Sequence, residues 1–66
     1  MRLAGTVTEF DAAVGLGSVD AADGTRYPFH CIEIADGSRR IEVGTAVTFE
    51  LIGKLGRFEA ARIAPV

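Results

Sequence analysis

The stretch Val14–Cys31, VGLGSVDAADGTRYPFHC, decides the fold. Near its centre stands Asp23-Gly24, a dipeptide that favours the tight turn of a β-hairpin. The segments on both sides of this turn contain valine, tyrosine and phenylalanine, which strands prefer. The first segment also contains Gly15 and Gly17, and glycine within a strand indicates a sharp bend or a close approach of another group. We therefore predict a β-hairpin whose first strand is strongly bent or leaves room for a ligand against its backbone.

Extended segments separated by turns continue on both sides of this hairpin. The predicted strands are Leu3–Phe10, Gly15–Asp20, Thr25–Ile32, Thr45–Ile52 and Arg57–Ile63. The longest irregular stretch is residues 33–44. Five short strands in a chain of 66 residues favour a closed barrel, because closure removes exposed sheet edges. The predicted fold class is therefore all-β, a five-stranded antiparallel barrel. Its predicted core consists of Val7, Val19, Phe29, Val47, Phe49 and Ile63.

Length and composition limit the chain to a single domain, residues 1–66. The one cysteine rules out an internal disulfide, and no cluster of cysteine and histidine can hold a structural zinc ion. No apolar run approaches the roughly 20 residues of a membrane span, and the N-terminal residues lack the pattern of a signal peptide. We expect a cytoplasmic domain without a membrane partner.

The charge balance argues against a protein that holds nucleic acid by charge alone. The chain has seven basic and nine acidic residues, and its net charge is −2. Contacts from lysine and arginine to phosphate dominate such binding. Six of the seven basic residues are arginine, however, and arginine grips phosphate with two hydrogen bonds and stacks on bases. The charge is therefore a weak argument against nucleic acid and not a decisive one.

Three segments carry a resemblance to a known family. Gly5–Asp11, GTVTEFD, is similar to the sequence G-x-V-K-W-F-N; Gly15–Val19, GLGSV, stands in the place of G-F-G-F-I; and Tyr27–Cys31, YPFHC, stands in the place of V-F-V-H-F. Two weaker matches follow at residues 42–49 and 56–63, each with a shift of one residue. The order and spacing of these segments resemble the cold-shock domain over nearly the whole chain. The resemblance implies an OB-fold barrel that binds single-stranded RNA or DNA.

Most of the aromatic positions on which this family stacks bases are replaced here. Glu9 stands where the family has tryptophan. The positions of four phenylalanines hold Leu16, Ser18, Pro28 and Cys31. Phe10 and His30 keep the family's residues. Stacking one base on one aromatic contributes about 1–3 kcal/mol, so the loss of three or four such platforms predicts weak binding.

The resemblance implies a contact face that draws on the first strands, the long loop and the last strand of the barrel. Its predicted members are Phe10, Leu16, His30 and Phe58, with Arg39, Arg40 and Arg57 as phosphate contacts. The alternative for the same face is a protein-interaction module or a homodimer, in which Val14, Leu16 and Pro28 pack against a protein. The predicted partner is therefore a weakly bound single strand of RNA or DNA, with a protein or a second copy of the chain as the alternative.

No group of residues predicts catalysis. Neighbouring side chains in a strand alternate between faces, so we expect the side chains of Tyr27, Phe29 and Cys31 inside the barrel. Those of Pro28 and His30 are then expected outside it. A catalytic pair of Cys31 and His30 is therefore disfavoured, and Cys31 is expected to be a small core residue. We predict no catalytic residue, no metal site and no cofactor.

Overall fold

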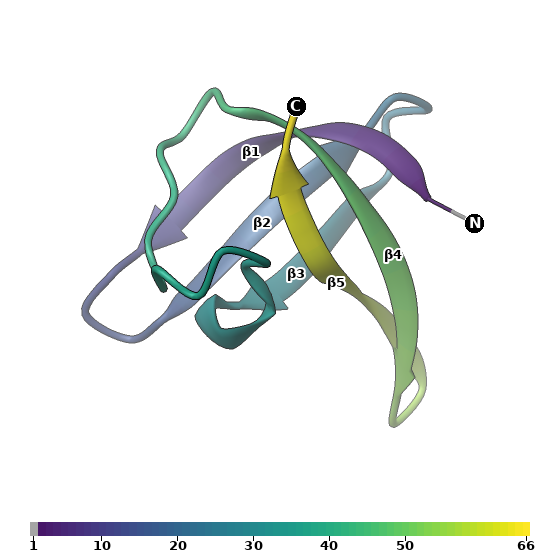
Figure 1. The fold of residues 1–66 in the computed structure, drawn as a ribbon. Coiled ribbons are helices and arrows are strands. Elements are labelled where there is room, and N and C mark those ends of the chain that lie inside the picture. The colour runs from purple at the N-terminus through teal and green to yellow at the C-terminus, as the bar shows by residue number, and fades with distance from the viewer. Residues whose placement is uncertain (1) are drawn as a thin grey trace.

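All five predicted strands are present, with shifts at their ends. The computed structural model describes residues 2–66. Within this range the elements are β1 (Leu3–Asp11), β2 (Leu16–Ala21), β3 (Arg26–His30), the short 3-10 helix η1 (Cys31–Glu33), β4 (Ala46–Lys54) and β5 (Arg57–Pro65). The strands form one antiparallel sheet in the order β3-β2-β1-β4-β5 (Figure 1). The predicted all-β, five-stranded antiparallel fold is confirmed.

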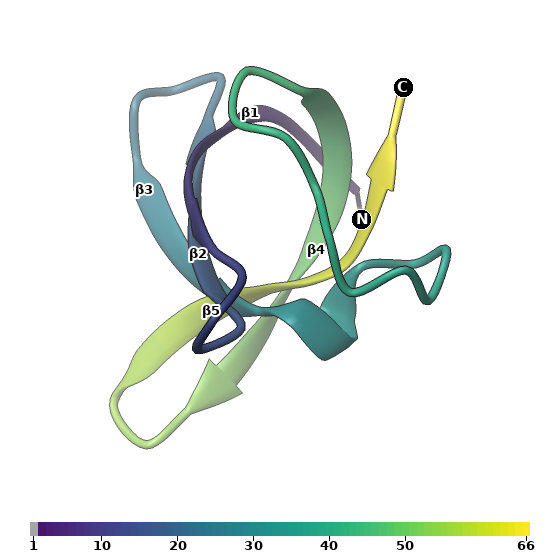
Figure 2. The ribbon, with the colours of Figure 1, turned by 90° about the vertical axis from the view of Figure 1, so that its left-hand side faces the viewer.

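The sheet curls until its two edge strands, β3 and β5, lie beside each other. Figure 2 shows the resulting ring of strands. No ladder of hydrogen bonds joins β3 to β5 in the described part of the chain. One parallel bridge connects Ile34 with Ile63, and the Ala35 amide donates to the Ile63 carbonyl over 2.7 Å. The closed barrel expected from the sequence is therefore a strongly curved sheet, which is closed by packing and by this one bridge.

The core lies inside this ring, and the six residues predicted for it are all buried. Each exposes at most 1% of its surface. Ile34 and Ala60 complete the buried cluster. Tyr27 and Cys31, which were expected inside, are only partly buried and pack against its edge. Burial of one large apolar side chain contributes about 1.5–3 kcal/mol, so this cluster is the main source of stability for so small a chain.

The third strand ends two residues earlier than the sequence predicts. β3 stops at His30, and Cys31 begins η1, where the Ile34 amide donates to the Cys31 carbonyl over 3.2 Å. This turn leaves Ile32 exposed and brings Ile34 into the core against β5. The strand propensity of the segment is overridden because the chain must cross from one edge of the sheet to the other.

Gly15 and Gly17 have different roles in the fold. Gly15 lies just before β2 with a φ angle of 74°, a left-handed conformation that favours glycine. Gly17 lies within β2, and a Cβ atom there would stand 2.5 Å from Cζ of Phe29 and 2.6 Å from the Glu9 carbonyl oxygen. The missing side chain of Gly17 therefore makes room for the core ring of Phe29. The geometry favours the bent and closely packed strand over the strand that leaves room for a ligand.

Candidate nucleic-acid interface

The outer face of β1, β2 and β3 carries two rows of side chains that lie across the strands. Because the side chains of Val19 and Phe29 point into the core, their neighbours along each strand point outward. The register aligns Asp11, Leu16 and His30 in one row, and Glu9, Ser18 and Pro28 in the next. Leu16 is 45% exposed, and His30 is also exposed. Two predicted contact residues, Leu16 and His30, are thus direct neighbours on one face.

A shallow hollow of about 210 Å³ brings Arg57 to the same place. Leu16, Pro28 and His30 line this hollow together with Arg57 and Glu59 of β5. The Arg57 side chain is 66% exposed, and its Nη2 donates to Oε2 of Glu59 over 3.2 Å. An apolar surface, an imidazole and a guanidinium therefore meet in one hollow, where they can contact a base and its phosphate.

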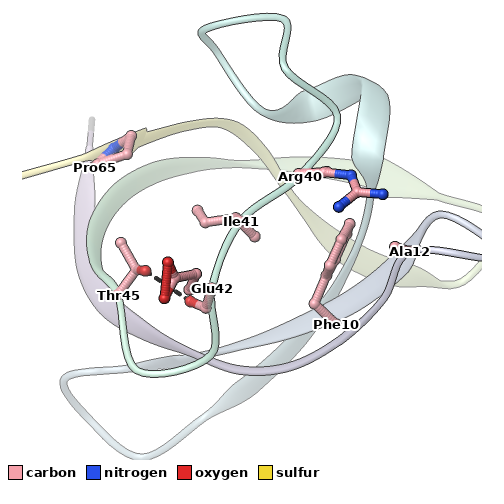
Figure 3. Close-up of a pocket in the computed structure, with 7 residues that line it drawn as sticks. All are labelled: Phe10, Ala12, Arg40, Ile41, Glu42, Thr45 and Pro65. Carbon is pink, nitrogen blue, oxygen red and sulfur yellow. Dashed lines mark hydrogen bonds between the residues drawn. The ribbon is translucent and has the colours of Figure 1, made fainter.

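Phe10 points to the other side of the sheet. It pairs with Gly17, which in turn pairs with the buried Phe29. The rings of Phe10 and Phe29 stack, with their centroids 6.0 Å apart and their planes 6° apart. Phe10 also borders a hollow of about 520 Å³ beneath the long loop, where Arg40 and Ile41 lie beside it (Figure 3). The structure therefore does not bring the ring of Phe10 together with His30 on the outer face.

The long loop between η1 and β4 carries Arg39 and Arg40. Both are exposed, and neither has a carboxylate partner among residues 2–66. They share a hollow with Cys31 and with the β1–β2 loop, residues 12–15. The other arginines all have carboxylate partners: Arg2 and Arg62 pair with Glu50, Arg26 with Asp20, and Arg57 with Glu59. Arg39 and Arg40 are therefore the guanidinium groups most available to an external phosphate.

Phe58 lies on the β4–β5 hairpin, which extends beyond the ring of strands (Figure 2). It is 60% exposed and pairs with Gly53, and Leu55 at the tip is fully exposed. Because neighbouring side chains in a strand point to opposite sides, Phe58 and Arg57 point away from each other. The hollow formed by Leu16, His30 and Arg57 does not include Phe58.

Carboxylates occupy much of the remaining outer face. Glu9 accepts a hydrogen bond from the Ser18 hydroxyl over 3.3 Å, and Asp11 accepts one over 2.9 Å from a backbone amide in the next turn. Arg26 donates to Asp20 over 2.7 Å, and this hydrogen bond lowers the pKa of the Asp20 carboxyl. Glu9 and Asp11 have no cationic partner among the described residues. These two charges make the face less favourable to phosphate.

Sequence reasoning missed Glu59 as a member of this site. Glutamate is almost never fully buried unless it is paired. The residue type alone therefore gave no reason to place Glu59 in a hollow. The spacing from Arg57 is the signal that could have found it. Residues two apart in a strand share a face, so an arginine and a glutamate at this spacing can form an ion pair on one side of β5.

The described residues contain neither a candidate membrane span nor a candidate metal site. No helix in the range 2–66 is long and apolar enough to cross a membrane. No group of three or more histidine, cysteine, aspartate or glutamate side chains in this part of the chain is placed to hold a metal ion. The cytoplasmic location and the lack of a cofactor stay predictions.

Comparisons with known proteins agree with this fold. No protein-family model matches the sequence, and no curated protein matches it either. Among solved structures, Drosophila Unr CSD456 matches the chain with a TM-score of 0.85 and 30% sequence identity. The match covers 100% of this chain and 27% of the Unr chain, so the chain spans about a quarter of that structure. The chain therefore has a cold-shock-domain-like fold, as the resemblance in its sequence predicted.

Proposed function

We propose that this chain is a non-catalytic domain that binds single-stranded RNA or DNA weakly through the outer face of β2 and β3. Its fold is that of a nucleic-acid-binding module. The observation that carries the proposal is the hollow that Leu16, His30 and Arg57 share. Leu16 and His30 offer a base an apolar surface and an imidazole, and the Arg57 guanidinium lies beside them for the phosphate.

Weak binding follows from the surroundings of this hollow. Arg39 and Arg40 add two free guanidinium groups near the start of β2, where the β1–β2 loop meets the long loop. Glu9 and Asp11 place carboxylates on the same outer face as Leu16. The face also lacks the aromatic platforms that contribute about 1–3 kcal/mol for each stacked base. Phosphate contacts at its edge are therefore the main expected source of affinity.

The salt dependence of binding measures the number of these phosphate contacts. If Arg39, Arg40 and Arg57 make them, two or three counterions are released, and the slope of log K against log salt is roughly −1.5 to −2 for a single strand. We expect this slope in anisotropy titrations of a labelled, pyrimidine-rich strand between about 50 and 200 mM salt. Replacing Arg39 and Arg40 together by glutamine should flatten the slope by about 1.4. A slope of about −5 would contradict the proposal, because it requires a larger basic surface.

A protein-interaction module or a homodimer is the second candidate function. Val14 is 64% exposed and Leu16 is 45% exposed, so the face offers apolar surface at the entry to β2. The carboxylates of Glu9 and Asp11 suit a basic protein surface better than they suit a phosphate backbone. Both candidates use the outer face, so a change at its centre can separate them.

Replacing Glu9 with tryptophan is that change. Glu9 lies across from Ser18 on the outer face, next to the row of Leu16 and His30. The substitution adds a stacking platform and removes a negative charge, so we expect single-strand binding to tighten about five- to a hundredfold, or by about 1–3 kcal/mol. The chain has no other tryptophan. Quenching of the new fluorescence on titration with an oligonucleotide at fixed salt therefore reports binding directly.

A Glu9→Gln variant is the matched control, because it removes the charge without adding a ring. It should recover only the smaller, salt-dependent part of the gain. Light scattering on the same samples gives the oligomeric state. Unchanged fluorescence of the Glu9→Trp variant, together with a shift in its molecular mass, would count against nucleic-acid binding and favour the protein-interaction module.

A further inference from the structure

Glu59 is a buried carboxylate on a surface that is proposed to meet phosphate. Among the charged residues in the described part of the chain it is the one that is buried, with 5% of its surface exposed. Charged side chains are almost never buried without a partner, and the partner here is Arg57, whose Nη2 donates to Oε2 of Glu59 over 3.2 Å. Both residues line the hollow of Leu16, Pro28 and His30. The carboxylate therefore lies behind the guanidinium that this hollow contains.

We propose that Glu59 limits the affinity of this face for nucleic acid by occupying Arg57. This inference rests on the proposed function and deepens it. A phosphate that reaches Arg57 must compete with the Glu59 carboxylate for the same N–H donors, and it meets the negative charge of that carboxylate behind them. Glu59 is thus an internal competitor of phosphate. It keeps Arg57 in place while it offsets the charge of the guanidinium.

The burial of Glu59 makes this competition stronger than at an ordinary surface pair. The Glu59 side chain is 7% exposed, whereas that of Arg57 is 66% exposed, so a ligand reaches the guanidinium from outside while the carboxylate stays behind it. Arg26 and Asp20 form a more open pair, with side chains 56% and 34% exposed. Water and salt screen such an exposed pair well, and they screen a buried charge much less. Glu59 is therefore the carboxylate most able to oppose phosphate at this hollow.

Replacing Glu59 with glutamine tests the inference, because glutamine has the same shape and can still accept a hydrogen bond from Arg57. We expect the variant to bind a labelled, pyrimidine-rich single strand about three- to tenfold more tightly at about 50 mM salt, with a slope of log K against log salt that is steeper, by at most about 0.7. That increment corresponds to one additional phosphate contact. Adding Arg57→Gln to this variant should remove the gain.

A Glu50→Gln variant is the matched control. It also removes one negative charge, but from a carboxylate that pairs with Arg2 and Arg62 in a different hollow. We expect its affinity to change less than about twofold, because exposed charges are screened beyond a Debye length. Equal gains from Glu59→Gln and Glu50→Gln would show a general charge effect, which overturns the inference and leaves the proposed function standing.

The remaining outcomes also decide the question. If the wild-type chain does not bind but Glu59→Gln does, the inference is supported. If neither binds, both the inference and the proposed function fail.

Thermal melts report whether Glu59→Gln folds; if it does not, Arg57→Gln alone is informative. The inference predicts that this single change flattens the wild-type salt slope by clearly less than the roughly 0.7 of a full phosphate contact, because Glu59 already holds part of the Arg57 guanidinium. A slope flattened by the full increment of about 0.7 would mean that Arg57 was free all along.

Discussion

Replacing Phe49 with alanine is expected to lower the free energy of unfolding by about 3–5 kcal/mol. Phe49 exposes 0% of its surface, and its ring lies 6.0 Å from that of Tyr27, measured between centroids. Alanine leaves a cavity that the surrounding strands can fill only in part. Small proteins have about 0.05–0.15 kcal/mol of stability per residue, so a chain of 66 residues has roughly 3–10 kcal/mol in total. The variant should therefore be largely unfolded or close to it, as measured by circular dichroism in a urea titration.

Phe58→Ala is the matched control for this experiment. The substitution is the same, but Phe58 is 60% exposed on the β4–β5 hairpin and leaves no cavity. We expect a change within about 0.5 kcal/mol, as is usual for surface positions. A Phe49→Ala variant with the same urea midpoint as the wild type would place Phe49 outside the core and would refute the arrangement of strands described above.

The core could be predicted from the sequence because strand alternation is a local property. Val47 and Phe49 are separated by one polar residue. Phe29 lies in the second strand of the hairpin whose turn is formed by Asp23-Gly24. The helix η1 could not be predicted in this way. It exists because Ile34 has to reach Ile63 on a strand near the other end of the chain. That requirement belongs to the closure of the ring and leaves no local pattern.

The outer face also combines features that local alternation predicts with features that depend on contacts between strands. Alternation places His30 outside and Phe29 inside, and the structure agrees because β3 is regular there. Counting by twos from the buried Val7 would place Glu9 inside and Phe10 outside. The β-bulge between Val7 and Glu9 shifts the register by one residue and exchanges their faces. A bulge is a property of the paired strands, so one strand's sequence does not reveal it.

Replacing Gly17 with alanine is the second change with a large expected effect. The added Cβ atom would lie 2.5 Å from Cζ of Phe29 and 2.6 Å from the backbone carbonyl oxygen of Glu9. Phe29 cannot easily move, because it is 1% exposed and its ring stacks on that of Phe10. The carbonyl can move only with the backbone of β1. Overpacking of this kind costs about 1–3 kcal/mol or more, so we expect the melting temperature to fall by at least roughly 5 °C.

The comparison with Gly53→Ala decides why the chain has glycine at position 17. Gly53 also lies within a strand, but a Cβ atom there meets nothing within 4 Å. Alanine at Gly53 should therefore be neutral or stabilise the chain by up to about 1 kcal/mol. If Gly17 is required by packing, the Gly17→Ala variant loses stability. Its affinity for a single strand then falls only because the displaced strands also move the side chains of the outer face. If Gly17 instead keeps the strand open for a base, Gly17→Ala would melt like the wild type and lose affinity alone. Melting curves and anisotropy titrations on both variants separate the two, and the 2.5 Å approach to a core ring predicts the first result.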